Sequence, residues 1–128
     1  MSYPMRAVYA GEMVLIQNIN YQIPFPIDQD FYLSSEFQSV LQNDTDWDYT
    51  LHEYYYRPQF ELFNQTRNLR ENLSKDADYK NIFGGLKSAL KRWQWDTNDP
   101  WRCAPNGVLQ DSAKYKESPQ CFPLKNEL

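Results

Sequence analysis

The sequence predicts a mainly α-helical protein, a compact single-domain helical bundle with a short N-terminal β-hairpin as the open alternative at its start. Two observations favour this fold class: apolar residues recur at helical spacing between Pro58 and Trp93, and 128 residues fit one domain. The predicted domain covers 1–128, with irregular chain or short strands over 1–26, a helical core over 30–95, and a loop, a short helix and an extended tail over 96–128.

The segment that ends at Pro26 leaves two alternatives open. The apolar residues within 7–16 fit a pair of short helices broken at Gly11. Residues 19–23 instead alternate between apolar and polar side chains, as a short strand does. Prolines at the end of the segment terminate either kind of element.

The next helix is expected to begin near Ser35. Ser35 and Gln38 have the spacing of a capping box, and Phe37 opens a short apolar stripe. Asn43 and the aspartate after it end this helix. Residues 43–58 show no period, so they are expected to form an ordered connection.

Two longer helices are predicted after Pro58. The first carries Leu62 and Leu73 eleven residues apart, a helical spacing, with other apolar residues between them. The second begins at Asp76, a good N-cap, and repeats its apolar positions at helical spacing up to Trp93. The Gly84–Gly85 pair inside it indicates either close packing against a neighbour or a kink.

The remaining chain is expected to be less regular. Residues 96–107 are rich in Asn, Asp and Pro and predict a loop that ends in a turn at residues 104–107. A short helix is predicted over 108–115, and an extended tail beyond Ser118. Cys103 and Cys121 are expected to be free thiols, with a disulfide between them as the alternative.

Composition narrows the classes of partner. The net charge is −4 and the pI is near 4.9, which argues against direct nucleic-acid binding and against adsorption to a membrane. No apolar run is long enough for a signal peptide or a membrane span, so a cytoplasmic location is expected. A basic protein is the partner that this charge fits best.

Charge and aromatic residues are concentrated in one window. Residues 28–61 carry a net charge of −7 and nine of the 21 aromatic residues, whereas residues 62–128 carry +3. A negative field with exposed Tyr and Trp is typical of a protein-binding surface, although the same residues could serve as a solvated face and a core. The candidate partner-binding residues are Asp44, Asp46, Trp47, Asp48, Tyr49, Glu53, Tyr54, Tyr55 and Tyr56.

No residue pattern indicates catalysis, so the protein is predicted not to be an enzyme, with no cofactor, metal or small-molecule substrate. The acidic spacing that starts at Asp44 resembles a calcium loop, but Tyr49 and Tyr55 stand where such a loop needs Gly and Glu. His52 is the only histidine, which excludes a two-histidine zinc motif. Lys87, Lys91 and Arg92 form a basic helix face, with Arg67 and Arg70 on the predicted helix before it. This patch is interpreted as solvated or internally paired, with phosphate binding as the alternative.

In size, acidity, aromatic content and absence of a catalytic set, the chain resembles bacterial toxin-immunity proteins of the contact-dependent growth-inhibition type. That resemblance implies an inhibitor that occludes the active site of a cognate, basic, nuclease-type toxin domain. Two alternatives stay open. The chain could be a phage-encoded or anti-restriction inhibitor of a nucleic-acid-handling protein, or a structural or adaptor subunit.

Overall fold

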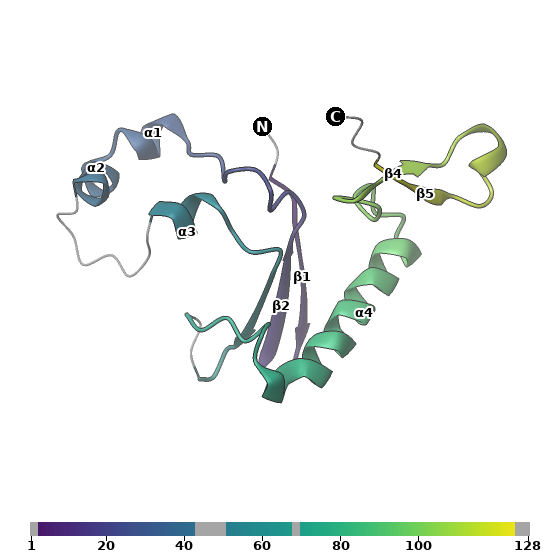
Figure 1. Cartoon of the computed structure of the whole chain (residues 1–128), viewed down its shortest axis with the longest axis horizontal. Helices are drawn as coiled ribbons and strands as arrows, with labels where there is room; N and C mark the ends of the chain where they lie inside the picture. Colours follow the sequence, from purple (N-terminus) through teal and green to yellow (C-terminus); the bar gives the residue numbers. More distant parts are fainter. Residues whose placement is uncertain (1–2, 43–50, 68–69, 125–128) are drawn as a thin grey trace.

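The protein has a mixed α/β fold with two antiparallel sheets and a long helix (Figure 1). The computed structural model describes residues 3–42, 51–67 and 70–124. The strands are β1 (Met5–Ala10), β2 (Met13–Asn18), β3 (Phe60–Asn64), β4 (Gly107–Gln110) and β5 (Gln120–Pro123). The helices are α1 (Gln29–Tyr32), α2 (Ser35–Leu41), α3 (Leu51–Tyr55) and α4 (Lys80–Asp96), with 3-10 turns η1 (Ala77–Tyr79) and η2 (Ala113–Tyr115).

The predicted fold class, a mainly α-helical bundle, is therefore wrong. The N-terminal segment is a β-hairpin in which β1 pairs with β2, and Gly11 lies in its turn with a φ of +58° that favours glycine. The hairpin lies at residues 5–18, which include the region for which the apolar pattern also fits a pair of helices. Residues 19–23, whose alternation predicts a strand, lie outside this hairpin. β3 then pairs with β2 to complete a three-stranded sheet of order β1-β2-β3.

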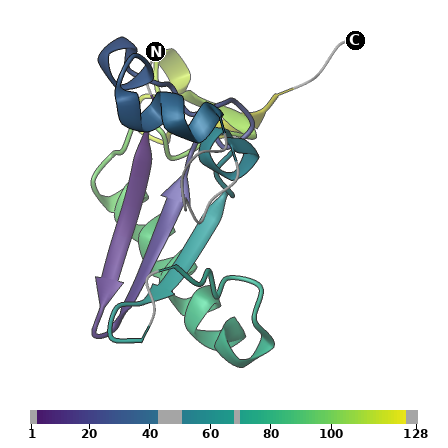
Figure 2. The ribbon, with the colours of Figure 1, turned by 90° about the vertical axis from the view of Figure 1, so that its left-hand side faces the viewer.

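The core lies between this sheet and α4, which runs along one face of it (Figures 1 and 2). The strand register aligns Val8, Leu15 and Leu62 in one row across the three strands. Leu15 and Leu62 are fully buried, and Leu86 of α4 joins them in the same cluster. We refer to β1–β3 together with α4 as the helix–sheet body.

The helix predicted after Pro58 is absent from the described part of that segment. Leu62 lies on β3 and Leu73 lies beyond a loop, yet both belong to the core cluster. The two segments lie side by side, because the Leu73 amide donates to the Leu62 carbonyl at 2.8 Å. Asn72 extends this pairing, since its Oδ1 accepts from the Leu62 amide at 2.9 Å and its Nδ2 donates to the Phe60 carbonyl at 3.2 Å. Their helical spacing in sequence thus reflects two chain segments that converge on one core.

The strongest helix prediction is confirmed by α4. Asp76 caps the preceding turn η1, accepting a hydrogen bond from the Asp78 amide. Gly84 and Gly85 do not pack closely against a neighbour, because a Cβ built on either one would meet nothing within 4 Å in the described structure. Neither α4 nor any other helix of the described ranges has the length and apolar character that crossing a bilayer requires.

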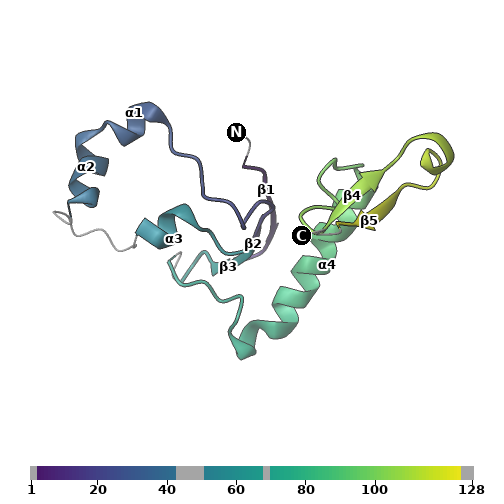
Figure 3. The same ribbon diagram turned by 45° about the horizontal axis from the view of Figure 1, so that its top comes forward.

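Helices α1–α3 form an arm on the side of the sheet away from α4 (Figure 3). The predicted second helix is present as α2, although Ser34 rather than Ser35 is its N-cap, accepting from the Phe37 amide. Phe37 is buried and contacts the rings of Phe31 and Tyr54, with centroid separations of 5.1 and 6.1 Å. These three rings, the ring cluster, hold the arm together.

Strands β4 and β5 form a second, two-stranded sheet at the opposite end of the molecule from α1 and α2 (Figure 1). The short helix predicted over 108–115 is wrong, because that segment contributes β4 and only the single turn η2. The prediction of free thiols is also wrong. Cys103 and Cys121 form a disulfide with a Cα–Cα distance of 5.4 Å, which ties β5 to the loop that precedes β4.

Candidate functional site

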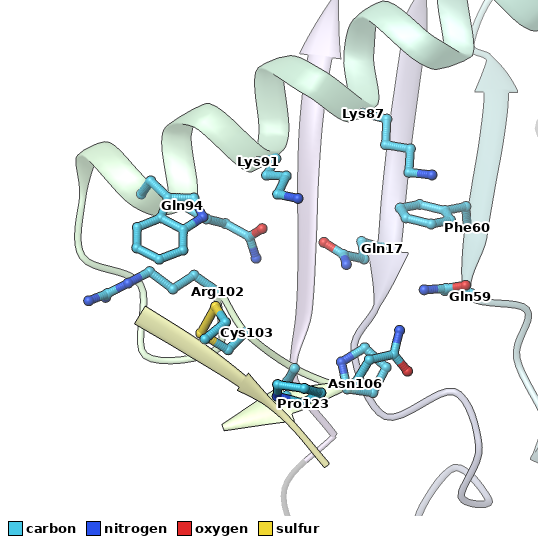
Figure 4. Close-up of a pocket in the computed structure, with 15 residues that line it drawn as sticks. Gln17, Gln59, Phe60, Lys87, Lys91, Gln94, Arg102, Cys103, Asn106 and Pro123 are labelled. Atoms are coloured by element: carbon cyan, nitrogen blue, oxygen red, sulfur yellow. A yellow bond between two sulfur atoms is a disulfide. The ribbon is translucent and has the colours of Figure 1, made fainter. Parts of the chain in front are cut away.

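A cavity of about 620 Å³ lies where α4, the three-stranded sheet and the β4–β5 hairpin meet (Figure 4). Its floor follows from the strand register. One row beyond the apolar row of the core, the same face of the sheet carries Arg6, Gln17 and Phe60. Gln17 and Phe60 line the cavity together with Gln59, so the apolar core gives way here to an amide-bearing surface.

The helix wall of the cavity is basic. Lys87 and Lys91 are one turn apart on α4, next to the buried stripe of Leu86 and Leu90, and both line the cavity. Figure 4 shows both side chains descending from the helix toward the sheet. The Lys87 ammonium lies 5.0 Å from the centroid of the Phe60 ring, a cation–π distance.

No carboxylate side chain is among the described residues that line this cavity. Likewise, neither Lys87 nor Lys91 forms an ion pair with any residue that the structure describes. A like-charged pair on one turn of a helix is mildly destabilising, so two unpaired lysines here leave a local positive potential in an otherwise acidic protein.

Arg102 adds a third positive charge at the end of the cavity. It is 92% buried, and its guanidinium lies 5.0 Å from the centroid of the Trp95 ring. One terminal nitrogen donates to the Asp99 carbonyl at 3.0 Å, whereas the buried Nε has no hydrogen-bond partner among the described residues. Arg102 and Trp95 both line the cavity.

Asp99 anchors the end of α4 to the sheet beside this cavity. Its two carboxylate oxygens accept hydrogen bonds from Nε and a terminal nitrogen of Arg6, each at 2.8 Å, and the Gln94 amide donates to it at 3.2 Å. The bonds from Arg6 lower the pKa of Asp99, although burial acts in the opposite direction. The carboxylate of Asp99 thus neutralises Arg6 rather than the lysines of the cavity.

The hairpin supplies the remaining wall. Cys103, Asn106, Cys121 and Pro123 all line the cavity, and the Leu124 amide donates to the Asn106 carbonyl at 3.0 Å. Figure 4 shows the disulfide at the edge of the cavity, below Gln94. The disulfide and this hydrogen bond hold the two ends of the hairpin segment together beside the cavity.

The predicted partner-binding residues are divided between undescribed and described parts of the chain. Five of them lie outside the described residues: Asp44, Asp46, Trp47, Asp48 and Tyr49. The others belong to α3 or directly follow it: Glu53, Tyr54, Tyr55 and Tyr56. Tyr54 packs in the ring cluster, where burial raises the pKa of its phenol, whereas Tyr56 is 45% exposed. Their role in binding a partner stays a prediction.

The described residues contain no group of three or more His, Cys, Asp or Glu side chains arranged to hold a metal ion. His52, the single histidine, is exposed and lies against the Tyr56 ring, with 5.1 Å between centroids. Within the described ranges, the cavity near α4 is therefore the arrangement with the clearest chemical capacity. It offers positive charge and amide groups to an anionic ligand.

Sequence reasoning found only part of this site. The predicted basic patch contains Lys87 and Lys91, but it also includes Arg92, Arg67 and Arg70, which do not line the cavity. Neither lysine forms an ion pair with a carboxylate that the structure describes. Gln17, Gln59 and Arg102 were missed. These three come from separate stretches of the chain and carry no shared local motif, so only the strand register and the hairpin bring them together.

No protein family model matches the chain. The chain is 46% identical over 135 aligned positions to a human N-sulphoglucosamine sulphohydrolase, a match that covers the whole chain but only 26% of the human protein. This finding overturns the resemblance to toxin-immunity proteins, the inhibitor function that it implied and the prediction that the protein is not an enzyme. The similarity points instead to a sulphohydrolase-related domain.

Proposed function

We propose that this chain contributes to a sulphohydrolase activity directed at N-sulphoglucosamine. The observation that carries the proposal is the 46% identity to the human sulphohydrolase along the full length of the chain. The chain spans about a quarter of the length of that relative. The sulphohydrolase activity belongs to the whole human protein, and we propose it for the protein to which this chain contributes.

The structure supports a role next to an anionic substrate. Lys87 and Lys91 lie on α4, whose buried face packs on the sheet in the helix–sheet body. This packing holds the backbone that carries the two lysine side chains in a fixed position. Positive charge lining a cavity raises the local concentration of an anion. A sulphated sugar is an anion at every physiological pH.

A chimera provides the sharpest test. The matching quarter of the human sulphohydrolase is replaced by this chain, and the chimera is assayed for release of sulphate from N-sulphoglucosamine. We expect an active chimera, because nearly half of the aligned positions are identical. The matched control carries the same replacement with Leu15→Ala and Leu62→Ala, which should unfold this part and abolish activity. A correctly folded chimera without activity contradicts the proposal.

The cytoplasmic location stays a prediction, and the Cys103–Cys121 disulfide gives a reason to test it. Disulfides persist in oxidising compartments and are rare in the cytosol. Alkylation of the protein with a thiol reagent directly after lysis of its native cells will show whether the two cysteines are oxidised where the protein resides.

A further inference from the structure

We propose that the cavity between α4, the sheet and the C-terminal hairpin is a binding site for a sulphated saccharide, whose anionic group is held by Lys87 and Lys91. The choice of sulphate among the possible anions rests on the proposed function; the choice of a saccharide rests on the lining of the cavity.

The positive charge of the described cavity lining favours an anionic ligand. The two ammonium groups lie on one face of α4, one turn apart, and the described lining includes Arg102 but no carboxylate. This contrast is local, because the chain as a whole carries a net charge of −4. Ammonium–anion hydrogen bonds are stronger than neutral ones, so each lysine of the lining offers a favourable contact to an anionic group in the cavity.

The neutral lining fits a sugar. Gln17, Gln59 and Asn106 each present an amide that can both donate and accept hydrogen bonds, which matches a ring that carries several hydroxyl groups. The rings of Phe60 and Trp95 provide apolar surface for the C–H face of such a ring. Figure 4 shows Gln17, Gln59 and Asn106 around the same space that the two lysines approach.

The dimensions and charge favour a small ligand over a polymer of high charge. An open cavity of about 620 Å³ is bordered by elements from three parts of the chain, and its volume lies within the range of roughly 300–1,000 Å³ that is typical of small-molecule sites. Binding of nucleic acid depends on many phosphate contacts with clustered basic residues, whereas this site offers two accessible lysines.

In the direct test, the full chain is titrated with N-sulphoglucosamine, and the NMR signals of its backbone and side-chain amides are followed. Calorimetry measures the affinity. N-acetylglucosamine tests the need for the anionic group, and inorganic sulphate tests the need for the sugar. We expect N-sulphoglucosamine to shift signals of Gln17, Gln59 and Asn106 and to bind at least about tenfold more tightly than either comparator. Equal binding of inorganic sulphate, or shifts confined to other surfaces, would overturn the proposal.

Two charge-matched variants of α4 separate this site from general electrostatic attraction. The site variant Lys87→Gln with Lys91→Gln should weaken binding about tenfold or more. The control variant Lys80→Gln with Arg92→Gln removes the same charge from positions of the same helix outside the cavity lining, and should change affinity less than about twofold, because neither side chain borders a ligand in the cavity and their longer-range attraction is screened. Equal weakening by both variants would overturn the proposal.

Failure of this inference can be told apart from failure of the proposed function. An active chimera together with a cavity that does not respond to N-sulphoglucosamine overturns the saccharide site and leaves the sulphohydrolase role in place. An inactive, folded chimera together with a cavity that binds the sugar in the expected order overturns the role and supports the site.

Discussion

The helix–sheet body and the C-terminal hairpin are held together by different forces. In the body, Leu15 and Leu62 are fully buried, and α4 adds Leu86 and Leu90 to the interior. In the hairpin, every residue of β5 is exposed and β4 is at most half-buried. A two-stranded hairpin of this kind is marginal in water by itself, and here a disulfide supplies the missing constraint.

This difference matters for function because the cavity lies at the junction of the two regions. The body supplies the lysines and the amides of the sheet, and the hairpin supplies Asn106, Pro123 and the disulfide. Loss of the core should therefore abolish the fold and the cavity together. Loss of the disulfide should open the cavity and leave the body intact.

The largest effect is expected from the core. Leu15→Ala removes a side chain with 0% exposure from the centre of the sheet, and such changes cost about 2–5 kcal/mol through lost burial and the cavity that remains. Val108→Ala is the matched control in the hairpin, since Val108 is 46% exposed and should cost less than about 1 kcal/mol. Urea unfolding measures both, and similar costs would contradict the distinction between the regions.

The disulfide variant Cys103→Ser with Cys121→Ser comes next. The chain-entropy account gives about 3 kcal/mol for a crosslink between residues 18 apart in sequence. We expect this loss to be confined to the hairpin, so amide hydrogen exchange should accelerate over residues 103–123 and stay slow in β2 and α4. Uniform acceleration across both regions would show that the hairpin and the body unfold as one unit.

The link between α4 and β1 is the third target. Asp99→Asn removes the charge that pairs with Arg6, and we expect a loss of about 1–3 kcal/mol because the Asp99 side chain is buried while Arg6 is partly solvated. Asp96→Asn changes an exposed carboxylate at the end of the same helix and should lie within about 0.5 kcal/mol of the parent.

The same pair predicts a pH dependence. The bonds from Arg6 lower the pKa of Asp99 in the folded state, so folding favours the ionised carboxylate. Its contribution is complete above the unfolded-state pKa of about 3.9 and is lost as the pH falls through the lower folded-state pKa. The stability difference between the parent and Asp99→Asn should therefore be constant from about pH 5 to 7 and shrink below about pH 4. A difference that grows on acidification would contradict this sign.

Local signals in the sequence were enough for α4 and not for β3. The local sequence of α4 predicts a helix, because it contains a capping residue at Asp76 and apolar residues at helical spacing. Leu62 and Leu73 showed the same kind of spacing, but they pack together because a loop returns the chain to the edge of β3. Pairing with β2 and with residues 72 and 73 decides the conformation of β3, and neither partner is visible in a local window.

The candidate site shows the same division. The two lysines of α4 were recognisable as a face of one helix, whereas the amides opposite them depend on register and on the hairpin. The disulfide was an open alternative, and an assumed reducing compartment decided the prediction wrongly. Two cysteines 18 residues apart carry no information about redox state until the strands that flank them are known to pair.

Two glycines give the smallest expected effects, with opposite signs in the two regions. At Gly84, in the middle of α4, a Cβ meets nothing within 4 Å, so Gly84→Ala should stabilise the body by up to about 1 kcal/mol through helix propensity.

At Gly107, where β4 begins, a Cβ would lie 3.0 Å from the Phe122 carbonyl oxygen and 3.3 Å from that of Cys103. Both neighbours are backbone atoms next to the disulfide, so they have little room to move. Gly107→Ala should therefore loosen the hairpin and reduce its protection from hydrogen exchange, while the midpoint of urea unfolding of the body stays unchanged. A Gly107→Ala variant with unaltered exchange would show that the hairpin is more adaptable than its disulfide implies.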